Sequence, residues 1–218
     1  MIKAVIWDFG GVFTTSPFAA FSRYEHDNGI PVGFIRSVNA TNPDSNAWAQ
    51  FESSRLSLGE FDVLFAEETE AAGYRIPGMA VIELLSGDIR PQMVDALGRI
   101  KQHYRVACIT NNVKGAGQGP GMANGDAKAL AVMEIMAQFD FVIESSVVGF
   151  RKPDPRIYQL ACEQLDIDAS EALFIDDLGV NLKPARAMGM TTIKVLSLEQ
   201  ALADLSAVLS MDLVGDAA

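Results

Sequence analysis

Five short apolar runs rich in β-branched residues recur along the chain, each close to the usual length of a strand. From the second run onward they alternate with stretches of helical periodicity, which predicts a parallel sheet with helices on both faces. The fold class expected is therefore α/β, with a Rossmann-like sheet. The runs are "IKAVIWDF" (2–9), "YRVACIT" (104–110), "FDFVIES" (139–145), "ALFIDD" (172–177) and "TTIKVL" (191–196), and the helical stretches are 126–137, 155–165, 179–188 and 198–209.

The first run stands apart, because far more residues separate it from the second than a connection between strand and helix needs. Helix-like patterns fill this interval at 16–29, 31–38 and 57–73, and a further one at 90–103 leads into the second strand. We expect a small helical cap subdomain at 15–85, inserted into a core domain made of 1–14 and 86–218. The glycine-rich stretch 114–125 predicts a flexible loop.

Composition and net charge limit the classes of molecule that the protein is expected to bind. The 218 residues are 49% hydrophobic, enough for one sizeable core, and carry a formal net charge of −11. Such a surface disfavours nucleic acid and anionic membranes, which attract dense Lys and Arg. Cys108 and Cys162 lie in apolar patterns and form no CxxC pair, which indicates core thiols in a reducing compartment. Without a signal-like or membrane-spanning apolar stretch, we expect a cytoplasmic location.

Polar side chains follow four of the predicted strands. Asp8 ends the first run, Thr110 the second, and the pair Asp176 and Asp177 the fourth, while Lys152 follows the third. In an open α/β sheet the ligand site is the crevice at the carboxyl ends of the strands. If all the strands are parallel, these side chains converge in one crevice.

Three carboxylates in one cleft repel each other unless a cation neutralises them, and hard oxygen ligands favour Mg²⁺. A lysine and a hydroxyl beside such a cation suit a phosphate group. A carboxylate can also act as a nucleophile and form an aspartyl-phosphate. The sequence therefore predicts a magnesium-dependent site for a small phosphorylated metabolite.

The order of these motifs resembles that of the haloacid dehalogenase-like (HAD) hydrolases. "DFGGV" is similar to the first motif of that superfamily, "ITNN" to the second, "RKP" to the third and "FIDD" to the fourth. The resemblance covers nearly the whole chain. The segment from Leu173 to Val195 is similar to the N-terminal phosphatase domain of soluble epoxide hydrolases, and "DFGGV" to the HAD domain fused to some acyl-CoA dehydrogenases.

The resemblance implies a role for each motif residue. Asp8 is expected to be the nucleophile and a metal ligand, together with the main-chain carbonyl of Gly10. Thr110 and the amide of Asn111 are expected to bind the transferring phosphoryl oxygens, and Lys152 to neutralise nucleophile and phosphate. Asp177 is expected to ligate Mg²⁺, with Asp176 beside it at the metal. The helical interval would be the cap that selects the substrate.

Gly10 departs from the commoner phosphatase pattern, in which an aspartate at this position protonates the leaving oxygen and then activates water. Such acid–base help is typically worth about 10²–10⁴-fold in rate. Its loss is expected to matter least for acyl, aryl or anomeric phosphates, whose leaving oxygen is already stabilised. The sequence leaves three possibilities open: activated substrates, another acid such as one from the cap, or a weak catalyst retained for binding.

Two other functions compete with the phosphatase hypothesis. A haloacid dehalogenase uses the same nucleophile without a metal, which leaves Asp176 and Asp177 unexplained. A phosphate-binding regulatory module also combines acids, a threonine and a lysine, but needs no insertion of this size.

Other polar and aromatic residues have simpler interpretations. His26 and His103 are expected at the surface, and Trp48 and Phe51 are expected to pack within the cap. Lys183 is a possible partner of an anion, and Pro184 is expected early in its helix, where its missing N–H costs little. The substrate and the oligomeric state do not follow from the sequence.

Overall fold

The computed structural model describes residues 1–112 and 126–214, and the predicted loop at 114–125 lies outside them. Its centre is a five-stranded sheet in the order β3-β2-β1-β4-β5. Every pair of neighbouring strands is parallel, so the predicted α/β class is confirmed. The strands are β1 (Ala4–Trp7), β2 (Arg105–Thr110), β3 (Phe141–Glu144), β4 (Ala172–Asp176) and β5 (Thr191–Lys194).

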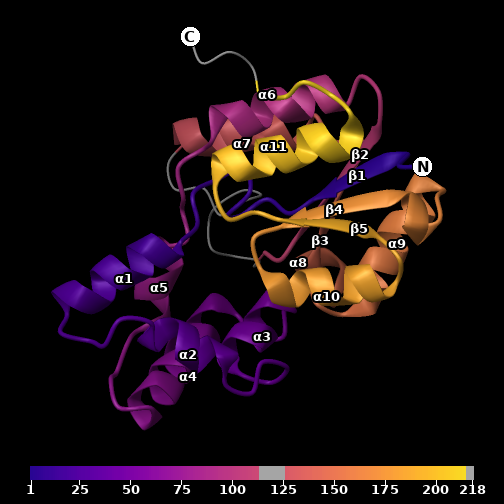
Figure 1. The fold of residues 1–218 in the computed structure, drawn as a ribbon. Coiled ribbons are helices and arrows are strands. Elements are labelled where there is room, and N and C mark those ends of the chain that lie inside the picture. The colour runs from indigo at the N-terminus through magenta and orange to yellow at the C-terminus, as the bar shows by residue number, and fades with distance from the viewer. Residues whose placement is uncertain (113–125, 215–218) are drawn as a thin grey trace.

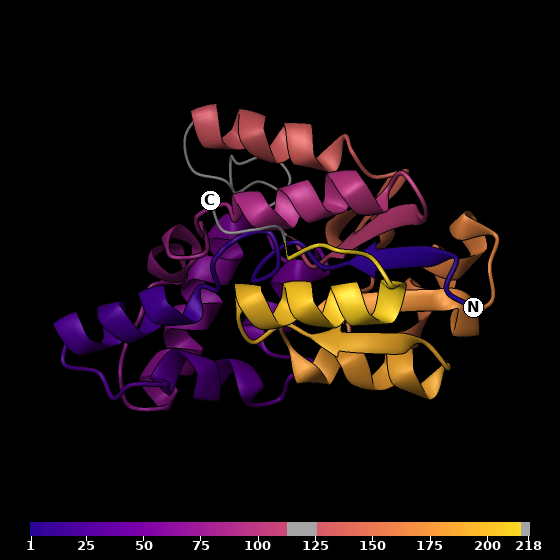
Figure 2. The same ribbon diagram turned by 45° about the horizontal axis from the view of Figure 1, so that its top comes forward.

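Helices cover both faces of this sheet, as the alternating pattern predicts (Figures 1 and 2). One face carries α6 (Pro91–Ile100), α7 (Asp126–Met136) and α11 (Leu198–Leu209), and the other α9 (Pro155–Leu165) and α10 (Gly179–Ala187). Side chains of β1 alternate between the two layers: Val5 and Trp7 pack on the first, Ala4 and Ile6 on the second. A strand buried on both faces explains why its sequence is apolar without alternation.

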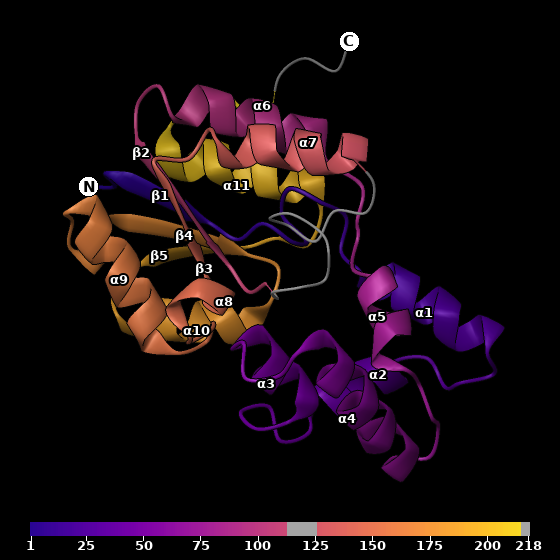
Figure 3. The same cartoon turned by 180° about the vertical axis from the view of Figure 1, so that it is seen from behind.

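Five helices lie together beyond the carboxyl ends of the strands (Figures 1 and 3). We call residues 15–85 the helical region. It has a hydrophobic core of its own, in which Phe51 stacks on Phe61 with ring centroids 4.4 Å apart and Trp48 packs edge-on against Phe61. The expected packing roles of Trp48 and Phe51 are thus confirmed. The helices are α1 (Phe18–Asp27), α2 (Phe34–Ala40), α3 (Ala47–Glu52), α4 (Leu58–Ala71) and α5 (Gly78–Glu83).

Several details differ from the sequence-based expectation. The helices α3 and α5 were not predicted, because six-residue helices show less than two turns of periodicity. Neither was the short α8 (Ser145–Val148) or a 3₁₀ turn at Ala169–Glu171. Pro184, expected early in its helix, lies in the interior of α10, where it removes one main-chain hydrogen bond. The helix begins at Gly179, as predicted, so the expected early position of Pro184 was wrong: it is the sixth of the nine residues of α10.

Both free cysteines are buried in the two sheet layers, as predicted. Burial raises the pKa of the Cys108 thiol well above its usual value, which keeps the thiol protonated. Within the described residues, no helix combines the length and the apolar composition needed to cross a bilayer. The cellular compartment stays a prediction.

The chain leaves the sheet for the helical region and returns to it along two neighbouring segments. Thr14 and Ile89 form an isolated antiparallel bridge, and the N–H of Thr15 donates to the carbonyl of Asp88 at 2.8 Å. Gly87 packs so closely here that a β-carbon would lie 2.2 Å from the carbonyl oxygen of Thr15. The position therefore requires glycine for space.

We predict that Gly87→Ala lowers the unfolding free energy by about 1–3 kcal/mol, because the methyl group forces the two crossing segments apart. Thermal unfolding measures the loss. Gly59→Ala serves as the control, since a β-carbon at Gly59 meets nothing within 4 Å. Equal melting temperatures for the two variants would contradict the close approach at Gly87.

Candidate active site

Three neighbouring strands bring polar residues to one edge of the sheet. Asp8 directly follows β1, Thr110 is the last residue of β2, and Asp176 is the last residue of β4. The strands lie side by side in the order β2-β1-β4, and the N–H of Asp8 donates to the carbonyl of Ile175 at 2.8 Å. The sheet register itself therefore places these side chains together at its carboxyl edge.

A buried lysine joins two of the acids. The Nζ of Lys152 lies 2.7 Å from Oδ1 of Asp8 and 2.8 Å from Oδ2 of Asp176. The lysine side chain is 1% exposed and that of Asp176 is fully buried. Because isolated charges are very costly to bury, the lysine and the two carboxylates depend on each other for their ionised states.

The electrostatics of this cluster favour a cation. Burial raises the pKa of Asp8 well above its usual value, although Lys152 opposes the shift and Asp176 and Asp177 add to it. Burial likewise raises the pKa of Asp177 to about 6, with a further contribution from Asp176. Burial lowers the pKa of Lys152, but its ion pairs with Asp176 and Asp8 outweigh this and raise it overall. The lysine is charged, and one ammonium faces three acids.

Asp176 is held by protein donors on every side. Besides the lysine, its carboxylate accepts hydrogen bonds from Nδ2 of Asn181 at 3.0 and 3.1 Å and from the N–H of Leu178 at 2.7 Å. Asn181 comes from the first turns of α10, the helix that begins three residues after Asp176. Its role was missed in the sequence, where it stood only as a polar residue after the acid pair. The arrangement makes Asp176 the group that fixes the ammonium of Lys152.

Asp177 has fewer protein partners. Its Oδ2 accepts a long hydrogen bond of 3.4 Å from the hydroxyl of Ser16. The close approach of Asp177 to the turn after β1 depends on Gly11, which has a φ of +74°. A β-carbon at Gly11 would lie 2.2 Å from Oδ2 of Asp177. The second glycine of "DFGGV" is therefore needed both for its backbone conformation and for space.

Gly10, in contrast, has open surroundings. A β-carbon there would meet no atom within 4 Å, and Gly10 is not among the residues with positive φ. Neither space nor backbone conformation thus excludes an aspartate at this position. The lack of an acid at position 10 is therefore not imposed by the backbone or by neighbouring atoms.

The side chain of Asn111 makes contacts that the motif did not suggest. Its side chain accepts a hydrogen bond from the N–H of Lys152 at 2.9 Å and donates to the carbonyl of the same residue at 3.0 Å. The side-chain amide is thus occupied by the main chain of Lys152. Any phosphoryl binding by Asn111 therefore falls to its own main-chain N–H, next to the buried Thr110.

The acids fit a divalent cation. One carboxylate oxygen from each of Asp8, Asp176 and Asp177 lies within 4.8 Å of the others. Oxygen ligands of this kind suit Mg²⁺. Asp177 has the fewest protein donors of the three, whereas Oδ1 of Asp8 and both oxygens of Asp176 already accept hydrogen bonds. Gly10 lies in the turn between Asp8 and Gly11, and its predicted carbonyl ligand role stays a prediction.

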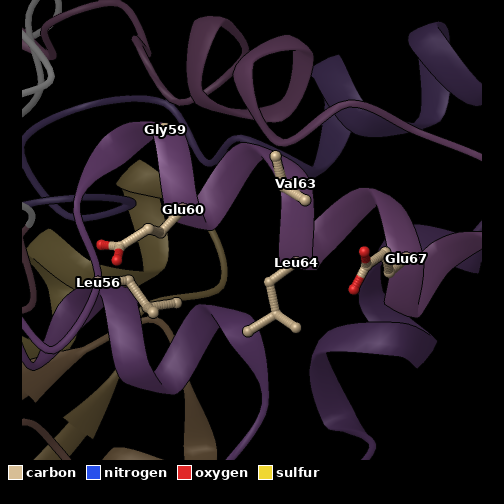
Figure 4. A pocket seen from close by; sticks show the side chains of 6 residues that line it. All are labelled: Leu56, Gly59, Glu60, Val63, Leu64 and Glu67. Atoms are coloured by element: carbon tan, nitrogen blue, oxygen red, sulfur yellow. The ribbon is translucent and has the colours of Figure 1, made fainter.

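Other polar residues and a surface hollow that could have contributed to a functional site lie away from this cluster. His26, His103 and Lys183 are exposed, His26 beside the carboxylate of Asp27. A shallow hollow of about 430 Å³ lies on the surface of α4 (Figure 4). It contains neither Lys152 nor any of the three acids, and one of its carboxylates, Glu60, is engaged in capping α4. Its lining consists of Leu56, Gly59, Glu60, Val63, Leu64 and Glu67.

Comparison with known proteins identifies relatives over nearly the full chain. The mouse (Mus musculus) acyl-CoA dehydrogenase family member 10 is 35% identical over 97% of this chain, which spans 19% of that protein. The pig (Sus scrofa) bifunctional epoxide hydrolase 2 is 29% identical over 98% of this chain, which spans 40% of it. The chain thus spans less than half of either relative. The sesquiterpene phosphatase astK of Aspergillus oryzae is 27% identical over 86% of this chain and 87% of its own.

Solved structures share the fold. A predicted HAD-like hydrolase of Porphyromonas gingivalis has a TM-score of 0.63, at 21% identity over 96% of this chain and 98% of its own. A HAD family enzyme of Bacteroides thetaiotaomicron in complex with magnesium and inorganic phosphate has a TM-score of 0.57, at 21% identity over 89% and 94%. The L-2-haloacid dehalogenase of Xanthobacter autotrophicus with covalently bound chloropropionic acid has a TM-score of 0.60, at 21% identity over 95% and 83%.

A family model for the haloacid dehalogenase-like hydrolases matches residues 2–189, which include the whole cluster of acids and lysine. The family resemblance inferred from the four motifs is confirmed. The chain is a member of the haloacid dehalogenase-like hydrolase family.

Proposed function

We propose that this hydrolase is a Mg²⁺-dependent phosphatase that acts on a small phosphorylated metabolite through Asp8. The observation that carries the proposal is the ammonium of Lys152 between Asp8 and Asp176, with Asp177 close by. The sesquiterpene phosphatase among the relatives supports it, as does the magnesium and phosphate complex of the Bacteroides enzyme.

The hydrogen bonds of Asp8 indicate which oxygen attacks. Its Oδ1 accepts from Nζ of Lys152 at 2.7 Å and from the N–H of Phe9 at 2.7 Å. Within the described residues, no donor is bonded to Oδ2. We assign Oδ2 as the atom that forms a bond to phosphorus while the bond from phosphorus to the leaving oxygen breaks.

The remaining residues stabilise charge around the transferring group. The ammonium of Lys152 faces the carboxylate that becomes bonded to phosphorus, and the hydroxyl of Thr110 and the N–H of Asn111 are assigned to phosphoryl oxygens. Mg²⁺, bound by Asp8, Asp177 and the carbonyl of Gly10, would screen the negative charges of nucleophile and phosphate from each other. Water then attacks phosphorus in the aspartyl-phosphate and releases phosphate, which regenerates Asp8.

A dehalogenase is the second candidate, favoured by the shared fold of the Xanthobacter enzyme. In that reaction Oδ2 of Asp8 would attack carbon and displace a halide. Asp177 argues against it, because a metal-independent reaction gives no reason for a third acid next to Asp8. A non-catalytic phosphate-binding module would retain phosphate on Asp8 without repeated release.

The proposal predicts repeated, Mg²⁺-dependent phosphate release in a screen of phosphorylated metabolites. Asp8→Asn is expected to abolish it, because an amide is a poor nucleophile, while the fold persists. Halide release from 2-haloacids in the presence of EDTA, without phosphate release from any phosphate ester, would replace this proposal with the dehalogenase.

Asp177 should make metal-free stability depend on pH. A folded-state pKa near 6, above the ordinary 3.8, favours the protonated carboxyl. Its contribution to stability is therefore complete below the ordinary pKa and is lost as the pH rises through about 6. We predict that Asp177→Asn raises the unfolding free energy in EDTA at about pH 7.5, by at most about 3 kcal/mol, and changes it little at about pH 4.

The same pair of proteins tests the metal. Added Mg²⁺ is expected to raise the melting temperature of the unmutated protein at neutral pH, because an ion that binds only the folded state stabilises that state. Asp177→Asn lacks a proposed ligand, so its melting temperature is not expected to rise. An equal rise in both would show that Asp177 takes no part in metal binding.

Gly10 predicts a steep dependence of rate on the leaving group. Without an acid at this position, aryl, acyl or anomeric phosphates should be hydrolysed far faster than alkyl phosphates. Because a β-carbon fits at Gly10, Gly10→Asp is expected to raise alkyl phosphate hydrolysis by about 10²-fold or more. Gly10→Ala is the matched control, since it adds the β-carbon without the carboxyl group.

A series of substituted phenyl phosphates provides the measurement. If the rate does not vary with leaving-group pKa, either another residue supplies the proton or dephosphorylation of Asp8 limits turnover. A rapid first turnover before a slow steady state identifies the second case. A flat series without such a burst would contradict the assignment of Gly10 as a missing acid.

A further inference from the structure

Glu52 is the last residue of α3 in the helical region, yet its side chain contacts the edge of the sheet. One of its oxygens, Oε2, lies 2.6 Å from a guanidinium nitrogen of Arg151, and the two side chains are 10% and 19% exposed. Figure 3 shows α3 beside α8, at the carboxyl ends of the strands. Neither Glu52 nor Arg151 has a role in the reaction described above.

Glu52 contacts two residues that adjoin or bind the main chain of Lys152, namely Arg151 and Asn111. Arg151 is the preceding residue, and its bond to Glu52 is short and charge-assisted. Oε2 of Glu52 also accepts a longer hydrogen bond of 3.4 Å from Nδ2 of Asn111. The same Asn111 side chain is bonded to the N–H and the carbonyl of Lys152. One buried carboxylate thus contacts both groups that fix this segment.

A purely structural role explains less of this arrangement. Neutral hydrogen bonds already join the helical region to the sheet edge: Ser145 donates to the carbonyl of Glu52 at 2.8 Å, and Ser54 donates to the carbonyl of Ser146 at 3.0 Å. A buried ion pair adds little stability to such an interface, because desolvation offsets its attraction. Its benefit is geometric, since two charge-assisted partners define where the Lys152 segment lies.

The residues that make these contacts come from two parts of the molecule, the helical region and the loops at the sheet edge. Glu52 belongs to the helical region, whereas Asn111 directly follows β2 and Arg151 lies in the loop after α8. Arg151 also donates to the carbonyl of Pro43, which again lies in the helical region. Contact between the helical region and the sheet edge therefore contributes to the position of the Lys152 main chain.

We propose that Glu52 is a positioning residue: through Arg151 and Asn111 it fixes the main chain of Lys152, and it makes the placement of the ammonium depend on contact with the helical region. The reaction that this placement serves rests on the phosphatase function proposed above. The placement itself can be measured without that function.

The test compares Glu52→Gln with Glu68→Gln. Glu68 lies in the same region, is partly buried and accepts a hydrogen bond from the N–H of Ala47, so it bonds within the helical region. We expect Glu52→Gln to lower kcat/KM for an aryl phosphate by about 10–100-fold, the range typical of residues that orient a site. The inhibition constant of orthophosphate should rise in parallel, and Glu68→Gln should change neither by more than about twofold.

Hydrogen exchange at the N–H of Lys152 gives a readout independent of activity. In Glu52→Gln this amide, which donates to Asn111, should exchange faster than in the unmutated protein, and in Glu68→Gln it should not. Unchanged exchange would overturn the proposal even if activity fell. If the unmutated protein releases no phosphate, the phosphatase proposal fails while this measurement still decides the role of Glu52.

The double variant Glu52→Gln/Arg151→Gln addresses folding, because it leaves no unpaired buried charge. Its loss of kcat/KM should match that of Glu52→Gln alone, since residues acting through one contact are not additive. Recovery of unmutated kcat/KM in the double variant would overturn the proposal, because it would reduce the role of Glu52 to neutralising Arg151.

Discussion

The buried ammonium of Lys152 is the constraint around which the rest of the site is arranged. With 1% of its side chain exposed, its charge needs partners in the protein, and Asp8 and Asp176 supply them at 2.7 and 2.8 Å. These acids come from adjacent strands, β1 and β4, so the parallel sheet is what brings them together. The arrangement leaves an excess of carboxylate, because Asp177 lies in the same cluster. That excess supports the proposed affinity for a cation.

The two glycines after Asp8 satisfy different requirements. Gly11 has a positive φ and leaves room for Asp177, so the acid cluster depends on it. Gly10 has free space around it, and in the proposed phosphatase it stands where related phosphatases carry an acid. The lack of an acid at this position shifts the expected substrates toward phosphates with good leaving groups.

The sequence was sufficient for the parts of this site that lie at strand ends. Strand runs and the acids, threonine and lysine that follow them are local signals, and parallel pairing then makes their meeting point predictable. The contacts of Glu52 with Asn111 and Arg151 were not predictable in this way, because they join segments far apart in the chain. Asn181 lies only five residues after Asp176, but its contact depends on how the chain turns from β4 into α10. The six-residue helix α3 gives too little periodicity to be recognised, and Glu52 is its final residue. Pro184 shows a different failure, since it lies in the interior of α10 against the local preference of proline for the first turn of a helix.

Stereochemistry at a chiral phosphorus in the hydrolysis of an aryl phosphate tests the central claim, nucleophilic attack by Asp8 on phosphorus beside Lys152, most directly. Attack by Asp8, followed by attack of water on the aspartyl-phosphate, makes two successive displacements at phosphorus, so the account predicts retention of configuration. Inversion would show that water attacks the substrate directly and would contradict the role assigned to Asp8.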